Sequence, residues 1–181
     1  MPNWCDNRVT ISHSDKSKID ALVQAAKDGH MFNHVVPMPE ALNISAAIGT
    51  ADEELKRLHK ENIEKYGYSD WYEFRLDAWG TKWDAAELHF EYLADNKVEL
   101  FFDTAWSPPI PIYEALELQG FDVVAYFSED GCGFCGKYES GEQFNFDHEE
   151  LENNEDPIAQ DVDAEYLIVE RKKHFDEENA I

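Results

Sequence analysis

The chain has 181 residues, of which 43% are hydrophobic and 13% aromatic, enough apolar material for one well-packed domain. Its formal net charge is −24, from 39 acidic and 15 basic residues. This charge argues against two kinds of partner, nucleic acid and anionic membranes, because both are bound through clustered lysine and arginine. It is compatible with a basic partner protein, a bound cation or high solubility.

Half of the excess negative charge lies in the last quarter of the chain. Residues 139–181 hold 15 acidic and three basic residues. We therefore expect a single domain over residues 1–146, followed by a partly disordered acidic C-terminal extension over residues 147–181.

The composition also predicts where the protein resides. No hydrophobic run approaches the roughly 18 residues that a membrane helix needs, and the N-terminus lacks the pattern of a signal peptide. Three cysteines, an odd number, fit a reducing compartment better than a disulfide scaffold. We expect a soluble cytoplasmic protein with no membrane partner.

The first predicted elements are a strand and a helix. Residues 4–12 alternate apolar and polar side chains, as a half-buried strand does, and a helix follows with Ser14 as its cap and Gly29 as its end. A short β-like segment over residues 32–36 then runs into Pro37-Met38-Pro39, where the prolines exclude a regular element.

Residues 40–78 are predicted to form a helical insertion. An exposed amphipathic helix spans residues 52–66 and ends at Gly67. A second short helix follows, capped by Ser69 or Asp70.

The pattern then changes to strands. Two strands over residues 88–93 and 98–102 form a hairpin, and a helix over residues 110–118 leads to a strand over residues 121–127. A last hairpin joins residues 134–138 to 143–146. The order β-α-β-β-α-β predicts an α+β fold, a ferredoxin-like split βαβ antiparallel sheet.

Two aromatic motifs about twenty residues apart are the most distinctive feature of the chain. They are Trp79-Gly80-Thr81-Lys82-Trp83-Asp84 and Thr104-Ala105-Trp106-Ser107-Pro108-Pro109. Tryptophan is costly to leave in water and geometrically specific when it packs. We expect indoles from separate stretches to meet and hold a corner of the sheet.

The first motif allows two interpretations. Lys82 lies between two indoles, where an ammonium group can contact a π-face, and could meet an anionic ligand in a pocket. Alternatively, the motif is a structural corner in which Lys82 neutralises nearby carboxylates. The candidate ligand or partner site comprises Asn3, Trp4, Trp79, Thr81, Lys82, Trp83, Asp84, Thr104 and Trp106.

No catalytic residue is predicted. Ser107 lacks the base, the orienting group and the Gly-x-Ser-x-Gly elbow of a serine nucleophile. His30 and His34 are four residues apart, but the expected break in the helix argues against a paired metal site. Asp147-His148-Glu149-Glu150 is expected to be a solvated charge run rather than a cation site.

Cys132-Gly133-Phe134-Cys135 is a single CxxC pair and only a weak candidate for metal binding. A redox CxxC normally opens a helix, whereas the glycines around Cys132 and Cys135 favour a turn or bulge between strands. We expect a reduced, structural pair and no cofactor. Three cysteines cannot hold a four-cysteine iron–sulfur cluster.

Several motifs resemble the YubB-type ferredoxin-like domain family, the Api-like proteins of uncharacterised function. They are Met1-Pro2-Asn3-Trp4-Cys5-x-Asn7, Val36-Pro37-Met38-Pro39, Trp79–Trp83, Thr104–Pro109 and Gly133-Phe134-x-Gly136. The resemblance covers roughly residues 1–140. It implies a ferredoxin-like fold, an origin in a phage, prophage or conjugative plasmid, and residence in the bacterial cytoplasm. It supplies no activity.

Three functional hypotheses follow from these observations. The first is an accessory protein that binds a host or mobile-element protein, with mimicry of DNA as its sharper form. The second is a small-ligand binder or enzyme that uses the Trp79–Asp84 and Trp106 region. The third, RNA binding on an aromatic sheet, is disfavoured by the charge.

Overall fold

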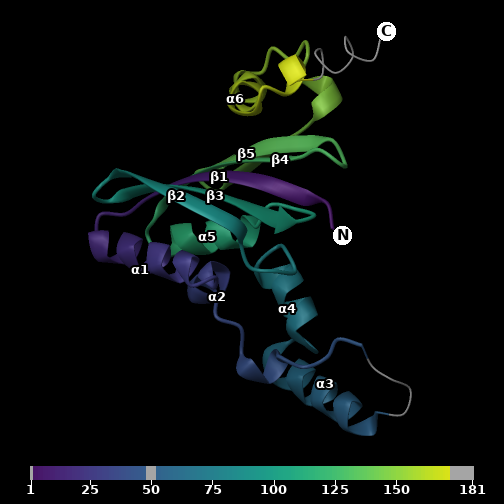
Figure 1. Cartoon of the computed structure of the whole chain (residues 1–181). Helices are drawn as coiled ribbons and strands as arrows, with labels where there is room; N and C mark the ends of the chain where they lie inside the picture. Colours follow the sequence, from purple (N-terminus) through teal and green to yellow (C-terminus); the bar gives the residue numbers. More distant parts are fainter. Residues whose placement is uncertain (1, 48–51, 172–181) are drawn as a thin grey trace.

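Six antiparallel strands form one sheet in the order β2-β3-β1-β4-β5-β6 (Figure 1). The computed structural model describes residues 2–47 and 52–171. The strands are β1 Trp4–Ser12, β2 Ala86–Ala94, β3 Lys97–Ala105, β4 Asp122–Glu129, β5 Phe134–Glu139 and β6 Glu142–Asp147. The ferredoxin-like order and the α+β class predicted from the sequence are confirmed.

Three helices cover one face of the sheet, which we call the helix-covered face. They are α1 Lys16–Lys27, α2 Met31–Val35 and α5 Ile110–Leu118 (Figure 1). Alternate strand residues such as Val9 and Leu100 meet Ile19 and Ile112 of the helices there, all essentially inaccessible to solvent. The period-two alternation of the strands therefore builds the main core on this side.

Two local predictions near the N-terminus are wrong. The cap of α1 is Asp15 rather than Ser14, because the Asp15 carboxylate accepts from the Ser17 amide at 2.9 Å. Residues 31–35 form α2 rather than a β-like segment. Asp84, about fifty residues away, accepts from the first amides of this segment, and such a distant contact is invisible to local patterns.

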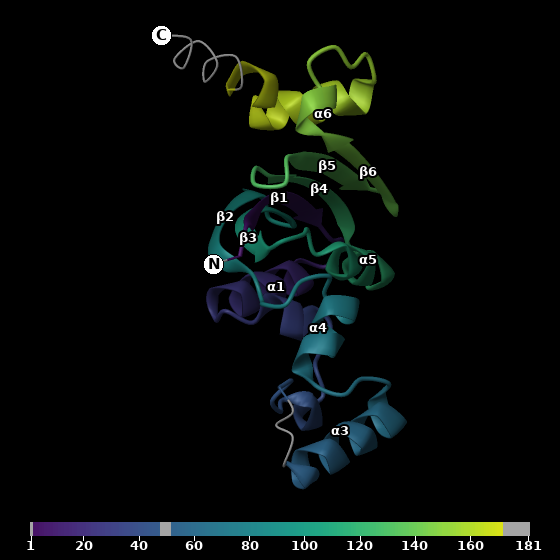
Figure 2. The ribbon, with the colours of Figure 1, turned by 90° about the vertical axis from the view of Figure 1, so that its right-hand side faces the viewer.

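The predicted helical insertion extends away from the sheet as an arm (Figures 1 and 2). It comprises the short 3-10 helix η1 Glu40–Leu42, α3 Glu53–Tyr66 and α4 Trp71–Ala78. Asp52 caps α3 and Gly67, at φ +83°, ends it.

Polar contacts dock α3 on the rest of the arm. His59 Nε2 lies 2.8 Å from the Ser45 carbonyl oxygen, and Asn62 donates to the carbonyls of Ala41 and Ser69. His59 and Asn62 are the buried residues of α3, whereas Ile63 is exposed. Because α3 buries little apolar surface, its attachment depends on these few hydrogen bonds.

The opposite face of the sheet carries α6 Pro157–Tyr166, preceded by the short helix η2 His148–Glu150 (Figures 1 and 2). Leu151, Val162 and Ile168 pack with Cys135 of β5 into a second, smaller apolar cluster. Residues 148–171 of the expected acidic extension are thus folded against the sheet, and the expected disorder is not found there. Residues 172–181 lie outside the described residues.

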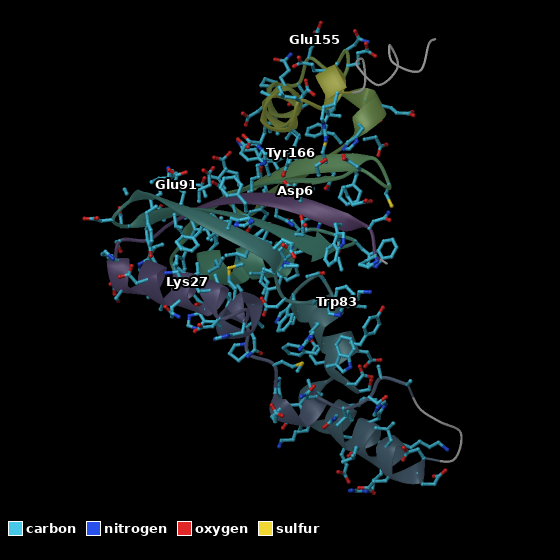
Figure 3. All side chains as sticks on the ribbon, in the orientation of Figure 1. Asp6, Lys27, Trp83, Glu91, Glu155 and Tyr166 are labelled. Carbon is cyan, nitrogen blue, oxygen red and sulfur yellow. The ribbon has the colours of Figure 1, made fainter. Side chains whose placement is uncertain are left out.

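On this second face α6 packs against β4 and β5, and β1, β2 and β3 carry an acidic surface that we call the open face. Asp6 of β1 lies directly opposite Asp103 of β3, and Glu99 of β3 lies opposite Glu91 of β2. Figure 3 shows Asp6 and Glu91 on the same side of the sheet as Tyr166. Like charges directly opposite each other destabilise a sheet, and among the described residues only Asp6 of the first pair has a compensating cation, Arg8 at 3.6 Å.

Candidate functional site

The two aromatic motifs meet at one end of the sheet, as the sequence predicts. Thr81 Oγ1 donates to the Ala105 carbonyl at 3.0 Å, and Ser107 Oγ donates to the Gly80 carbonyl at 2.7 Å. A Cβ atom on Gly80 would lie 2.8 Å from Pro111 Cδ, so a larger residue there would clash. The motifs form a tight structural corner.

A buried hydrogen-bond network extends this corner into the sheet. Thr104 Oγ1 accepts from Asn7 Nδ2 at 2.9 Å and donates to the Ser107 carbonyl at 2.7 Å. Tyr113 donates its hydroxyl to Asn7 Oδ1 at 2.9 Å. Thr81 and Thr104 are fully buried. They hold the corner and do not line a site, which corrects their inclusion among the candidate ligand residues.

Trp79 is a buried plug, with 1% of its surface exposed. Its indole Nε1 donates to the Val36 carbonyl at 3.0 Å, and its ring meets Phe32 and Phe74 edge to face. The structural interpretation of this tryptophan therefore holds. Arg75, which the sequence analysis did not single out, lies with its guanidinium 4.7 Å from the Trp79 ring centre.

Asp84 joins this corner to α2. Its Oδ1 accepts from the amides of Phe32 and Ala85, each at 2.9 Å, and its Oδ2 accepts from Asn33 at 3.2 Å. Burial raises the pKa of Asp84, and these backbone hydrogen bonds partly offset the rise. Its carboxylate is thus occupied in holding two segments together.

Three tryptophans of the same region are exposed and form what we call the indole patch: Trp4, Trp83 and Trp106. Trp4 and Trp83 have ring centres 5.9 Å apart and are 41% and 39% exposed. Trp106, at 48% exposed, follows β3, and its amide donates to the Asn3 carbonyl at 3.0 Å. The patch therefore lies where β1 begins and β3 ends.

The backbone of Trp106 is strained. Its φ of +75° is in the left-handed region, which a bulky residue rarely adopts. Strain of this kind costs on the order of 1–3 kcal/mol and concentrates at functional positions. The strained residue carries an indole that is exposed to solvent.

Lys82 contacts the patch rather than a carboxylate. Its ammonium group lies 4.0 Å from the Trp83 ring centre, which confirms the predicted contact with a π-face. Among the described residues, no carboxylate is within ion-pair distance of Lys82, so the proposed neutralising role is wrong.

Beside the indole patch lies a polar hollow that we call the acidic cleft, with a volume of about 340 Å³. It lies between the open face of the sheet and the C-terminal segment, and it is lined by Trp4, Asp6, Arg8, Asp103, Ser128, Asp130, Tyr166 and Arg171. Both arginines are already paired, Arg8 with Glu165 at 2.9 Å and Arg171 with Asp130 at 3.4 Å.

Asp103 is the carboxylate in the acidic cleft with no ion pair among the described residues. Burial raises its pKa, and the nearby carboxylates of Asp6 and Glu87 raise it further. A cation placed beside Asp103 would relieve this repulsion. Asp103 was not among the residues predicted from the sequence, because its position follows only from the register of β1 against β3.

Asn3 and the cysteines lie at the rim of the same end of the sheet. Asn3 Nδ2 is 3.5 Å from Glu129 Oε2 and 3.7 Å from Cys132 Sγ. Cys132 is exposed within the turn between β4 and β5 that the glycines predicted, and Cys135 is buried in β5. All three cysteines of the chain are free, as expected for a reduced pair.

The thiols are poorly suited to redox chemistry. Burial raises the pKa of Cys135 to about 12, and it raises that of Cys5 further still. The hydrogen bond with Glu129 raises the pKa of Cys132. A reactive cysteine needs a lowered pKa, so the geometry opposes a redox function.

The other sequence candidates do not assemble into a site. Ser107 uses its hydroxyl to close the corner. His30 and His34 do share a helical turn, contrary to the expected break, since the His34 amide donates to the His30 carbonyl. Over residues 2–47 and 52–171, no three histidine, cysteine or acidic side chains cluster closely enough to hold a metal.

The fold defines the class of protein, and a match to a family model shows the family. The class is a ferredoxin-like α+β domain with an arm and an added C-terminal helix. A family model described as the ferredoxin-like domain in Api92-like protein matches residues 78–170, more than half of the chain. The chain therefore belongs to this family. The match includes α6, beyond the roughly 140 residues that the motif resemblance covered.

One similar solved structure is that of protein api92 from Yersinia pseudotuberculosis. The similarity covers 81% of this chain and 98% of that chain, at 10% sequence identity and a TM-score of 0.47. The comparison with curated proteins gave no match. In the described part of the chain, no helix is both long enough and apolar enough to cross a bilayer.

Proposed function

We propose that this protein acts by binding another protein, with the indole patch as anchor and the acidic cleft as receptor for a basic segment. The observation that carries the proposal is the exposure of three tryptophans beside an unpaired, charge-crowded carboxylate. Tryptophan dominates the energetic centres of protein interfaces, and isolated monomers rarely expose several together.

Charge supports a basic partner. The net charge of −24 attracts cationic groups and speeds encounter with them. Asp103 would gain an ion pair on binding, and the like-charged pair with Asp6 would be relieved. The strained conformation of Trp106 is consistent with a residue retained for contact with a partner.

The biological setting forms part of the proposal. The motif resemblance supports a cytoplasmic accessory protein of a phage, prophage or plasmid, whose partner is a host or mobile-element protein. Mimicry of DNA is its sharper form, in which the paired carboxylates of the open face stand in for phosphates before a basic DNA-binding protein.

The test compares capture by the wild type with capture by two variants from a bacterial lysate. Trp106→Gly removes one indole and relieves the backbone strain, and Asp103→Asn removes one charge. We expect both variants to capture about tenfold less of the same basic proteins than the wild type does. The control variant Leu118→Ser, which changes an exposed residue of α5, should capture as much as the wild type.

Two follow-up measurements make the result decisive. The captured protein is purified, and its affinity for the wild type, the two variants and the Leu118→Ser control is measured by calorimetry. The titrations are repeated with duplex DNA as a competitor. Competition by the duplex supports mimicry of DNA, and its absence restricts the proposal to ordinary protein binding. Equal affinity of the wild type and both variants would remove the indole patch and the cleft from consideration.

A further inference from the structure

A second hollow lies on the other side of the corner, away from the indole patch. We call it the Arg75 cavity, and its volume is about 410 Å³. It is bounded by α2, the loop that leads to η1 and the end of α4. The lining residues are Gly29, His30, Asn33, Met38, Glu40, Asn43, Arg75, Trp79 and Asp84. This volume falls in the range of small-molecule sites.

Arg75 differs from every other arginine of the chain. Arg8, Arg57 and Arg171 each form an ion pair with a carboxylate. Arg75 has no carboxylate within ion-pair distance among the described residues, although the chain carries 39 acidic residues. Burial lowers its pKa, and the charge of Asp84, which lies beyond ion-pair distance, offsets this only in part. An unpaired guanidinium in so acidic a protein is the unusual feature of this cavity.

The hydrogen-bonding capacity of Arg75 is also largely unused. One Nη group donates to the Lys82 carbonyl at a long 3.5 Å, and the buried Nε finds no acceptor among the described residues. A guanidinium offers five N–H donors. Its planar faces are occupied, with ring centres of Trp71 and Trp79 at 5.2 and 4.7 Å, so that the side chain is held in place.

Two carboxylates also line the Arg75 cavity, and they differ in character. Asp84 is saturated by three backbone amides. Glu40 is exposed and has no hydrogen bond or ion pair from its side chain to any described residue. Glu40 and Asp84 would repel a ligand carrying only negative charge, whereas a positive group on the ligand would be attracted to Glu40.

We propose that the Arg75 cavity binds a small zwitterion of the amino-acid type. Its carboxylate pairs with the Arg75 guanidinium, and its ammonium group lies towards Glu40. The fork of an arginine matches a carboxylate in two parallel hydrogen bonds, which fixes the orientation of the ligand. Asn33 and Asn43 supply further polar groups in the same wall. This binding is independent of the protein-binding proposal.

The test is a titration of the isotopically labelled full chain, followed by nuclear magnetic resonance. The probes are glutamate, glutamine and phenylalanine, with succinate and inorganic phosphate as anions that lack an ammonium group. The indole N–H of Trp79 and the amides of Asn33 and Asn43 report on the cavity. We expect saturable shifts with at least one amino acid at millimolar concentration, and weaker binding of both simple anions.

Variants then assign the binding groups. Arg75→Met keeps the length of the side chain but removes the charge, and should weaken binding at least about tenfold. Glu40→Gln should weaken binding of amino acids without weakening that of succinate. Arg57→Met removes an exposed arginine of α3 and should leave both affinities unchanged.

The outcomes that overturn the proposal are distinct. Absence of saturable shifts at the cavity with every amino acid would refute it, as would equal affinity for succinate and the best amino acid. Retained affinity in Arg75→Met would refute the role of the guanidinium. Should Arg75→Met not fold, Arg75→Lys keeps the charge without the fork and must still bind more weakly than the wild type.

Discussion

The two faces of the sheet differ in how much apolar surface they bury and how much charge they carry. On the helix-covered face, α1, α2 and α5 bury a continuous apolar core. On the second face, α6 buries a small cluster, and the open face beside it carries Asp6 opposite Asp103. The helix-covered face is packed for stability, whereas the open face retains opposed carboxylates. This contrast supports the proposal that the second face contacts other molecules.

The largest predicted effect tests the difference between the two faces by substituting two neighbouring residues of β3. Leu100 points into the helix-covered face and is fully buried, whereas Phe101 points to the open face and is half-buried. Leu100→Ala should lower the free energy of unfolding by about 3 kcal/mol, because it leaves a cavity in a packed core. Phe101→Ala should cost about 1 kcal/mol. Urea denaturation measures both, and equal losses would contradict the contrast between the faces.

A second prediction concerns α6. Val162 is fully buried in the small cluster. Val162→Ala should lower the stability by about 2 kcal/mol through lost apolar burial. Amide hydrogen exchange should speed up mainly in α6 and little in β1 and β3. An even increase over the whole sheet would show that α6 is part of the main cooperative unit.

The smallest predicted effect is a gain in stability on the open face. Asp103→Asn should stabilise the fold at pH 7 by up to about 1 kcal/mol, since it removes repulsion between opposed carboxylates. The pKa of Asp103 is raised in the folded chain, so its charged form costs stability progressively as the pH rises above the ordinary value of 3.8.

The variant and the wild type should therefore differ little in acid and diverge as the pH increases. Thermal unfolding between acid and neutral pH measures this divergence. Glu155→Gln removes one exposed charge outside the acidic cleft and should show no such effect (Figure 3). A destabilised Asp103→Asn protein would indicate that the Asp103 carboxylate forms a favourable contact instead.

Much of the fold could be predicted because its signals are local. Strand alternation around Val9 and Leu100, and the prolines that start α5, are visible in the sequence. Three other features could not be predicted from local patterns, because they depend on tertiary contacts. The crowding of carboxylates at Asp103 arises from the register of two strands, and the helix at residues 31–35 is held by a distant carboxylate. The unused donor of Arg75 is known only because no acceptor lies near it among the described residues.

The tryptophans show the same limit within one motif. Sequence patterns predicted that indoles of separate stretches meet, and Trp4 and Trp83 do so. Trp79, however, packs on phenylalanines and is buried, while Trp83, four residues later, is exposed. The difference comes from packing against Phe32 and Phe74, which lie outside the motif. Composition predicts an aromatic corner, and only tertiary contacts decide which ring faces solvent.

The cysteines offer a practical consequence. Cys5 and Cys135 are shielded inside the protein, so a maleimide dye should attach to Cys132 alone without any prior mutagenesis. That attachment point neighbours Asn3, which directly precedes the first strand. The native chain thus carries a single-site fluorescent reporter of whatever docks there.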